Sequence, residues 1–378
     1  MNIEIKEVKN KKDLKAFIMT PFKIYRDDKK WIPPLLMDEY EVFNPKKNPA
    51  FENAKGTLFI AYKDNQVAGR IAGIISIIAN EKYKSKNLRF GWYDSINDQN
   101  VSDALFDAVE NWGKDEGMDT FTGPLGFTDL DPEGLMVEGF EEIPTVASNY
   151  NKDYYKTLIE NYGFKKEIDY IEFFAKIPEM DEIPEKLLKI SDRIKERGNL
   201  TIKTFKTKKE LVKRGKELFT LLDEAFDEIY GSTPLTDKQI TYYTNKYLPF
   251  VHKDLIKVID NEDGVMVGFM ISMPSLTKGV KDANGRLFPF GWIHMLKALK
   301  TYSHLDFYLA GVKKKYRGMG VDLLMVIEII KSAKKLGFKY CESNMELETN
   351  TKIHGLWKYF SPRQHKRRRI FKKNIGEK

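Results

Sequence analysis

The chain carries the same series of predicted elements twice, which points to a duplicated fold. Residues 3–15 read IEIKEVKNKKDLK and residues 200–212 read LTIKTFKTKKELV, identical at six of thirteen positions. Residues 58–69 and 255–268 follow in the same order, and each reads as a strand, a polar turn and a second strand. Self-similarity in preserved order indicates two copies of one domain.

A third pair of segments sets residues 101–117 beside residues 321–337. Both carry apolar residues at helical spacing, and both end at a glycine, which suits the left-handed position after a helix. The copies lie further apart here than at their first strands, which places an insertion near residues 275–300. The insertion holds turn signals and then a short basic amphipathic helix from Trp292. We interpret it as a lid or substrate loop, or as a helix that packs on its own domain.

Length and composition fit two α/β domains. With 378 residues, 42% of them hydrophobic, the chain can build two cores. We expect a first domain over residues 1–180, a linker helix over 181–199 and a second domain over 200–378, each with a mixed central sheet flanked by helices. The single cysteine, Cys341, excludes a disulfide framework. The charged first residues hold no signal-peptide core, so the cytoplasm is the expected compartment.

The net charge of +8 is concentrated near the C-terminus. Residues 361–378 contain eight Lys or Arg and one acid, and the rest of the chain is close to neutral. A basic run of this kind can bind the phosphates of CoA, RNA or lipid, or it can form an ordinary solvated face. Charge alone therefore does not select a partner.

The most informative segment is a strand, a basic turn with two glycines and the start of a helix. The strand spans residues 305–312, the turn reads KKKYRGMG over residues 313–320, and the helix begins at Val321. Gly318 and Gly320 let the backbone turn tightly and approach a ligand, so that successive amide N–H groups can point at one anion. The helix dipole and the basic side chains add favourable charge. Together these features predict a bound pyrophosphate.

Two common phosphate motifs do not fit this turn. A dinucleotide fingerprint needs a third glycine where the chain has Leu323, and a nucleotide P-loop needs Gly-Lys-Ser/Thr. Residues 315–320, a basic residue, two others and Gly-x-Gly, instead resemble the acyl-CoA pyrophosphate loop of the GNAT N-acyltransferase superfamily, and the order of elements is similar too. The resemblance implies tandem GNAT-like domains and acetyl-CoA or another acyl-CoA as cofactor. It implies cofactor contacts at Ala310, Gly311, Val312, Lys315, Tyr316, Arg317, Gly318, Met319, Gly320, Val321 and Asn350.

The same resemblance implies direct transfer in a ternary complex. A neutral amine attacks the thioester carbonyl, and backbone N–H groups around Gly311 and Val312 stabilise the oxyanion. A carboxylate must take the proton of the amine, directly or through water. Asp306, Glu346 and Glu348 are the candidates for this base, and each also reads as a plain surface carboxylate.

The position of the general acid departs from the family pattern. Seven residues after Asn350, where the family commonly has a tyrosine that protonates the leaving thiolate, this chain has Trp357. An indole N–H can donate a hydrogen bond but cannot serve as an acid at neutral pH. We therefore expect Tyr359 or water to take this role, or a different chemistry.

The first copy lacks the anion-binding turn. After the strand at residues 88–93 it has no glycine pair and no basic residue, and Asp94, Asp98 and Asp103 would repel a pyrophosphate. This copy resembles a degenerate GNAT half with a structural or acceptor-binding role. Residues 366–373, at the position of the family's last strand, are expected to form a basic edge strand.

A long acidic loop in the first copy is the candidate acceptor site. Asp129, Asp131 and Glu133 could meet an amine-bearing substrate, with Tyr155 and Trp292 as further candidate contacts, although an ordinary acidic turn explains the same carboxylates. The spacing does not match a helix-loop-helix calcium site, and the five histidines show no pair at metal-ligand spacing. No metal is therefore expected.

These observations predict an acyl-CoA-dependent N-acyltransferase that acts on a small-molecule or peptide amine. Two alternatives stay open. A Fem-like transferase would use aminoacyl-tRNA, which the intact pyrophosphate turn argues against, as it does against nucleic acid as a partner. A non-catalytic protein would bind acyl-CoA or an amine, which the loss of the tyrosine favours. The apolar, basic insertion around Trp292 points to a lipid-like or long acyl group and allows peripheral lipid contact.

Overall fold

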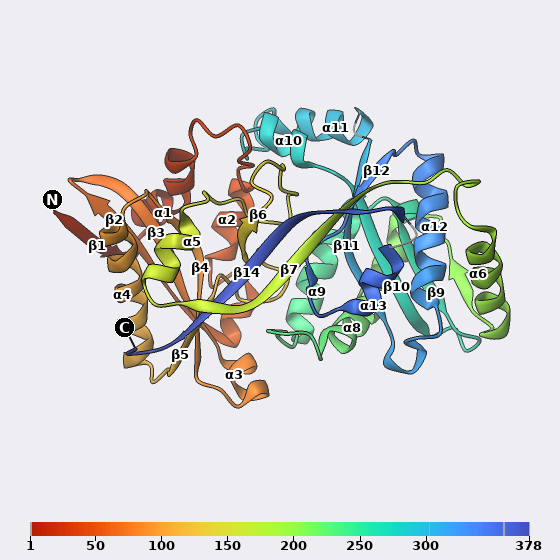
Figure 1. Cartoon of the computed structure of the whole chain (residues 1–378), viewed down its shortest axis with the longest axis horizontal. Coiled ribbons are helices and arrows are strands. Elements are labelled where there is room, and N and C mark those ends of the chain that lie inside the picture. Colours follow the sequence, from red (N-terminus) through yellow and green to blue (C-terminus); the bar gives the residue numbers. More distant parts are fainter. Residues whose placement is uncertain (1, 302, 358–359, 378) are drawn as a thin grey trace. The chain divides into compact units, whose positions relative to one another are not determined.

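The computed structural model describes residues 2–301, 303–357 and 360–377, and the chain forms two compact units (Figure 1). Unit 1 comprises Met1–Ile171, Leu276–Ala298 and His365–Lys378, and unit 2 comprises Glu172–Ser275 and Leu299–Gln364. Each unit has a sheet with helices packed on it, as the α/β prediction requires. The division is not sequential, because the insertion and the basic C-terminal run, both expected in the second domain, belong to unit 1.

Unit 1 is built on a mixed sheet. Its strands lie in the order β1 (Ile3–Glu7), β2 (Ala54–Lys63), β3 (Gln66–Ser76), β4 (Asn87–Ser95), β5 (Thr120–Gly123), β14 (Arg363–Asn374) and β7 (Lys165–Lys176), with β6 (Leu135–Glu138) paired to β14. Strands β4 and β5 run parallel, and the other registered pairs run antiparallel. The helices are α1 (Lys11–Ile24), α2 (Leu36–Val42), the short η1 (Pro49–Glu52), α3 (Ile77–Tyr83), α4 (Gln99–Asp115), α5 (Tyr155–Asn161), α10 (Thr277–Asp282) and α11 (Gly291–Thr301).

The core of unit 1 lies between its sheet and α4. Val101, Leu105 and Val109 repeat every four residues along α4 and are fully buried, because this spacing puts them on one face of the helix. They belong to the same cluster as Phe90 of β4 and Phe121 of β5, whose rings meet edge to face at 5.5 Å. This packing fixes the turn that joins β4 to α4.

Unit 2 repeats the arrangement. The division between the units falls inside β7, whose residues from Glu172 on belong to unit 2. The strands of unit 2 lie in the order β7, β12 (Tyr340–Glu342), β11 (His304–Val312), β10 (Met266–Pro274), β9 (Ile256–Asp260) and β8 (Thr201–Lys203), with β13 (Glu346–Leu347) paired to β7. The parallel pair β11–β12 corresponds to β4–β5. The helices are α6 (Glu185–Arg197), α7 (Lys208–Lys213), α8 (Gly215–Phe226), α9 (Asp237–Tyr247), η2 (Leu248–Phe250), η3 (Lys253–Leu255), η4 (Lys314–Tyr316), α12 (Val321–Lys335) and α13 (Thr351–Trp357).

Helix α12 is the counterpart of α4, as the repeat predicts. Val321, Leu324 and Met325 are buried on its inner face. Its first turn comes close to β10, where a Cβ on Gly268 would lie 2.7 Å from Cγ1 of Val321. Helix α6 occupies the residues where a linker helix was expected, and it packs on α12 as part of unit 2.

The prediction of a basic edge strand at the C-terminus is wrong. Strand β14 lies between β5 and β7 in the sheet of unit 1, and Arg368 and Lys373 on it are buried. The two buried charges have partners, since Lys373 pairs with an acid and Arg368 donates to the carbonyl of Asn149. Arg369 contacts Asp169 through two hydrogen bonds of 2.8 and 3.1 Å, and Lys373 donates to Glu110 at 3.0 Å. Much of the basic run is therefore engaged inside unit 1.

Among the helices that the structure describes, none is both long enough and apolar enough to cross a bilayer.

Candidate functional site

The basic glycine turn joins β11 to α12, as the sequence predicts. Lys313 at the end of β11 is tied to β10 by a hydrogen bond from its N–H to the carbonyl of Val267 at 2.8 Å. Gly318 and Gly320 both take left-handed backbone angles, with φ of +77° and +83°. A Cβ on Gly318 would meet nothing within 4 Å, so this part of the turn opens to solvent.

The first amides of α12 are uncapped. Within the described ranges, the N–H groups of Gly318, Gly320, Val321 and Asp322 donate no hydrogen bond to backbone or side chain. The N-cap residue is Gly320, which has no side chain to supply one. Uncapped amides at the positive end of a helix dipole form a ready site for an anion.

The corresponding helix of unit 1 is closed by its own side chain. Asp98 is the N-cap of α4, and its carboxylate accepts hydrogen bonds from the N–H groups of Asn100 at 3.0 Å and Val101 at 3.4 Å. The same carboxylate pairs with Lys63. An anion at this position would have to displace an aspartate that is already in place, so the two copies differ in the chemistry of one helix N-terminus.

Asp94 and Asp103, which were expected to repel a pyrophosphate, are engaged by other side chains of unit 1. Asp94 is buried and accepts a hydrogen bond from Nε of Arg70 at 2.8 Å and another from the hydroxyl of Tyr25 at 2.8 Å. Asp103 accepts from the side-chain amide of Gln99 at 2.7 Å. The first is part of a core ion pair and the second is engaged along α4, so the cap at Asp98 is what occupies the α4 terminus.

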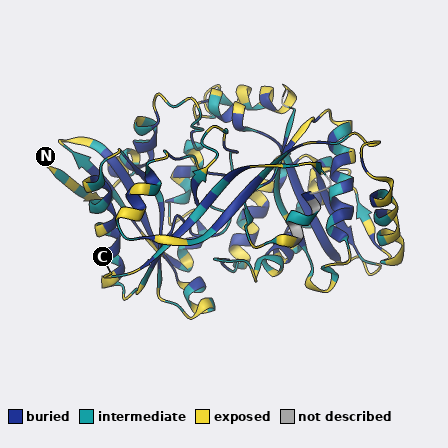
Figure 2. Cartoon of the chain, viewed as in Figure 1, coloured by how far each residue is buried: buried dark blue, intermediate teal, exposed yellow. Residues whose placement is uncertain are grey.

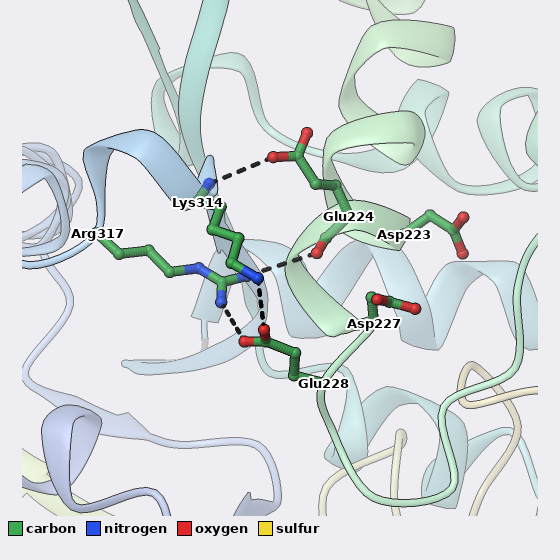
Figure 3. Close-up of a pocket in the computed structure, with 6 residues that line it drawn as sticks. All are labelled: Asp223, Glu224, Asp227, Glu228, Lys314 and Arg317. Carbon is green, nitrogen blue, oxygen red and sulfur yellow. Dashed lines mark hydrogen bonds and ion pairs between the residues drawn. The ribbon is translucent and has the colours of Figure 1, made fainter. Parts of the chain in front are cut away.

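Two of the bases in the turn are held by the end of α8 and by Glu228, which follows it (Figure 3). Lys314 pairs with Glu228 at 2.7 Å, and Arg317 pairs with the same carboxylate at 2.9 Å. Arg317 also donates to the carbonyls of Ala225 at 3.1 Å and Val312 at 3.3 Å. The hydrogen bond from Lys314 is the main reason why the pKa of Glu228 lies below its usual value. Arg317 therefore clamps the end of α8 to the turn, a role that the sequence did not reveal.

These contacts leave a shallow pocket that is mainly acidic. It is lined by Asp223, Glu224, Asp227, Glu228, Lys314 and Arg317. Four carboxylates and two bases do not attract an anion, so this pocket is distinct in character from the uncapped amides. Lys313 and Lys315 make no ion pair with any described residue, and Lys315 lies 6.0 Å from the ring centre of Tyr316.

Strand β11 loses its parallel partner halfway along. It pairs with β12 only from His304 to Asp306, whereas its pairing with β10 continues to Val312. Among the described residues, no strand pairs with β11 beyond Asp306 on the side where β12 lies. Asn344 donates one side-chain hydrogen bond to the carbonyl of Tyr308 there, at 3.1 Å. Strands β11 and β12 therefore separate beyond Asp306. Gly311 is explained by packing, since a Cβ there would lie 2.8 Å from the ring of Phe269.

A buried carboxylate, Glu346, lies on β13. Trp357 donates its indole N–H to Oε1 of Glu346 at 2.8 Å. Nε2 of His354 lies 3.7 Å from Oε2 of Glu346, and these two buried atoms make no hydrogen bond with any described residue. The ring of Phe173 stacks on Trp357 with centres 5.6 Å apart. The Glu346 carboxylate therefore accepts one hydrogen bond, from Trp357, and lies beside aromatic side chains.

Burial controls the charge of this cluster. It raises the pKa of Glu346 to about 7, and the hydrogen bond from Trp357 opposes that rise. Burial also lowers the pKa of His354, which favours the neutral imidazole. A carboxylate that is partly ionised near neutral pH is suited to take a proton from an amine.

The other predicted catalytic residues are placed differently. Asp306 is buried on β11, beside Glu342 of β12 in the parallel register. Glu348 lies between β13 and α13 and is partly exposed. Asn350 precedes α13, and its N–H bonds to the carbonyl of Leu347 at 2.9 Å. Tyr359 falls outside the described residues.

His354 is a site residue that the sequence does not single out. The available signal was its spacing of three residues from Trp357, which puts both side chains on one face of α13. It carried no weight because a lone histidine on a short helix has many ordinary explanations.

The candidate acceptor carboxylates of unit 1 have partners within their own unit. Asp131 accepts hydrogen bonds from the N–H groups of Phe127 at 2.9 Å and Thr128 at 3.1 Å, so it stabilises its own turn. Burial, and then the charge of Asp129, raise the pKa of Glu133 to about 8.

Two further acceptor candidates lie in contrasting surroundings. Tyr155 is fully buried, and its hydroxyl accepts a hydrogen bond from the N–H of Ser95 at 3.0 Å, which differs from the open position that substrate contact requires. Trp292 is 47% exposed on α11.

Comparisons with known proteins agree on the fold. No family model matches the chain. The chain is 29% identical over 372 residues to Protein YghO of Escherichia coli (strain K12), covering 97% of this chain and 94% of that protein. It is 28% identical over 384 residues to a bacterial ceramide synthase of Caulobacter vibrioides (strain NA1000 / CB15N), covering 99% of this chain and 98% of that protein.

Solved structures include a tandem GNAT protein from the clavulanic acid biosynthesis pathway, with TM-score 0.58, 10% identity and full coverage of both chains. A GCN5-related N-acetyltransferase from Sphaerobacter thermophilus has TM-score 0.51 and 14% identity, and the match covers 99% of this chain and 96% of that one. The chain therefore has the tandem GNAT fold that its sequence predicts.

Proposed function

We propose that the chain is an acyl-CoA-dependent N-acyltransferase whose reaction takes place in unit 2. The observation that carries the proposal is the uncapped N-terminus of α12, next to a strand whose outer edge is open, in a chain with the tandem GNAT fold. The equivalent terminus in unit 1 is capped by Asp98. The proposal therefore assigns cofactor binding to one copy only.

The residues of unit 2 fit the cofactor that this fold implies. The amides of Gly318 and of residues 320–322 would hold the pyrophosphate, with Lys315 as a nearby cation that makes no ion pair with the described residues. The open edge of β11 from Phe307 to Val312 would pair with the amide groups of the pantetheine arm. Bound acyl-CoA would supply the activated thioester carbonyl.

Glu346 is the base in this proposal. Its Oε2 atom, which has no hydrogen-bond partner among the described residues, would take the proton of the substrate ammonium group, directly or through water. Trp357 fixes the other oxygen and so orients the carboxylate. Because Trp357 cannot supply a proton, Tyr359 or water would protonate the leaving thiolate. Backbone N–H groups near Gly311 and Val312 would stabilise the oxyanion.

The acceptor we propose is the amine of a long-chain, lipid-like molecule. A ceramide is a fatty acyl amide of a long-chain amino alcohol, and the relative named as a ceramide synthase aligns over 99% of this chain. The acyl group would accordingly be long.

The test is turnover with a matched pair of variants. The protein is incubated with acetyl-CoA and with long-chain acyl-CoAs over a panel of amines that includes sphinganine and short polar amines. Free thiol and the N-acyl product are then measured. We expect thiol release with a long-chain amine, a loss of at least about 100-fold in Glu346→Gln, and unchanged rates in the control Glu328→Gln on α12. Binding of CoA without thiol release for any amine would contradict the proposal and favour a non-catalytic binding protein.

A further inference from the structure

The insertion at Leu276–Ala298 is firmly attached to the body of unit 1 through α10. Val280 is fully buried, and the hydroxyl of Thr277 donates to the carbonyl of Pro144 at 3.4 Å. The N–H of Leu36 donates to the carbonyl of Gly285 at 3.0 Å, and Lys281 donates to the carbonyl of Lys29. The segment is therefore a fixed part of the fold.

Helix α11 rests on α10 through small residues. A Cβ on Gly279 would lie 3.0 Å from Cβ of Ala298 and 3.1 Å from the carbonyl oxygen of His294, so the two helices touch backbone to backbone there. Among the α11 residues of unit 1, Ala298 is buried, whereas the large apolar residues are not. The helix is thus attached through its small residue, and its large apolar residues stay exposed.

The large apolar residues of this segment are exposed, and Figure 2 colours much of α11 as exposed. The apolar ridge, as we call it, consists of Phe288 (74% exposed), Phe290 (70%), Trp292 (47%), Ile293 (48%) and Leu296 (48%). A surface helix normally turns its apolar stripe toward the core, and a cluster of exposed large apolar residues marks an interaction surface.

Charge selects the kind of partner. The segment that carries the ridge has four basic residues, Lys278, Lys281, Arg286 and Lys297, and one acid, Asp282, which pairs with Lys278 at 3.0 Å. Aromatic and aliphatic side chains flanked by bases, on a helix that lies along the surface, are the features of an interfacial membrane helix. The indole N–H of Trp292 is already bonded to the carbonyl of Pro289 at 3.0 Å, so its ring can enter an apolar layer without an unsatisfied donor.

We propose that the apolar ridge docks unit 1 on an anionic lipid bilayer. The ridge enters the boundary between headgroups and acyl chains, and the neighbouring bases meet the anionic headgroups. This interaction is separate from acyl transfer, since it needs neither acyl-CoA nor turnover, and it would stand if the proposed reaction failed.

Vesicle flotation with the full chain tests the proposal. Vesicles of phosphatidylcholine alone are compared with vesicles that also contain phosphatidylglycerol. The ridge variant is Phe290→Ser with Leu296→Ser. The control is Phe250→Ser, which removes an aromatic residue that is equally exposed, at 73%, in unit 2. We expect wild type and control to float with the anionic vesicles, the ridge variant to float at least tenfold less, and added salt to weaken flotation.

A second measurement keeps the test decisive if the ridge variant folds poorly. Quenching of tryptophan fluorescence by brominated lipid should be strong in wild type and largely lost in Trp292→Phe. The proposal is overturned if wild type fails to float, if the ridge variant floats like wild type, or if brominated lipid quenches both proteins equally. It is also overturned if light scattering shows a dimer that only the ridge variant dissociates, since a second copy would then cover the ridge.

Discussion

The indole N–H of Trp357 lies 2.8 Å from Oε1 of Glu346 and donates a hydrogen bond to it. From the sequence, this tryptophan is a departure that removes a proton donor. In the structure it orients a buried carboxylate and offsets part of the desolvation that raises the pKa of that carboxylate. Trp357 therefore cannot be the general acid, but it supports the proposal that Glu346 is the general base.

Replacing Trp357 by Phe should raise the pKa of Glu346. A hydrogen bond to a charged group contributes about 1.5 kcal/mol or more, which corresponds to about one pKa unit. If Glu346 is the base, kcat/KM in wild type rises as the pH increases through about 7. This rise in kcat/KM should occur at higher pH in the variant, while CoA affinity stays the same. A rise at the same pH in both proteins would show that Glu346 is not the base.

The charge of Glu346 should also affect stability. Burial raises its pKa from an ordinary 4.5 to about 7, so the native state keeps this proton where the unfolded chain has lost it. The resulting stabilisation is complete below pH 4.5 and disappears as the pH rises through about 7, a change of up to about 3 kcal/mol. Glu346→Gln should remove this part of the pH dependence of the unfolding free energy, measured by urea titration at several pH values. Identical pH profiles for both proteins would refute the prediction.

The two glycines of the turn should differ in their tolerance of a methyl group. Both have positive φ, so alanine costs about 1 kcal/mol at either position. A Cβ on Gly320 would also lie 2.4 Å from Cδ1 of Ile194, whereas a Cβ on Gly318 meets nothing within 4 Å. Gly320→Ala should therefore lower the unfolding free energy by up to about 1 kcal/mol more than Gly318→Ala, because the end of the Ile194 side chain must move aside. Equal losses in denaturant titrations would contradict this difference in packing.

Lys315 and Lys314 should contribute unequally to CoA binding. Lys314 is paired with Glu228, whereas Lys315 has no ion-pair partner among the described residues. Lys315→Ala should weaken CoA binding several-fold at low salt and less at high salt, because an exposed charge is screened. Lys314→Ala should have the smaller effect in the same calorimetric titrations. A larger effect at Lys314 would show that its pair with Glu228 opens to receive the phosphates.

The repeat, the glycine turn and the insertion could be predicted from the sequence because each is a local pattern. The place of β14 could not. Its basic run resembles a solvated edge, and nothing near it in sequence indicates that Asp169 and Glu110 meet Arg369 and Lys373. The burial of Tyr155 is hidden for the same reason, since its partners come from distant segments.

The cluster around Glu346 was only partly predictable. The sequence offers this carboxylate only as one of three candidate bases, beside Asp306 and Glu348. What distinguishes it is an environment formed by α13 and by Phe173 of β7. Such an environment depends on tertiary packing and leaves no pattern of residue spacing.

The decisive measurement is amide hydrogen exchange, followed by mass spectrometry, with and without CoA. Binding of the pyrophosphate to uncapped amides should slow exchange in peptides that cover residues 317–324. It should leave peptides that cover residues 98–104 unchanged, because Asp98 already occupies the α4 terminus. Protection at the α4 terminus, or CoA binding that leaves the start of α12 unprotected, would contradict the assignment of the cofactor to unit 2.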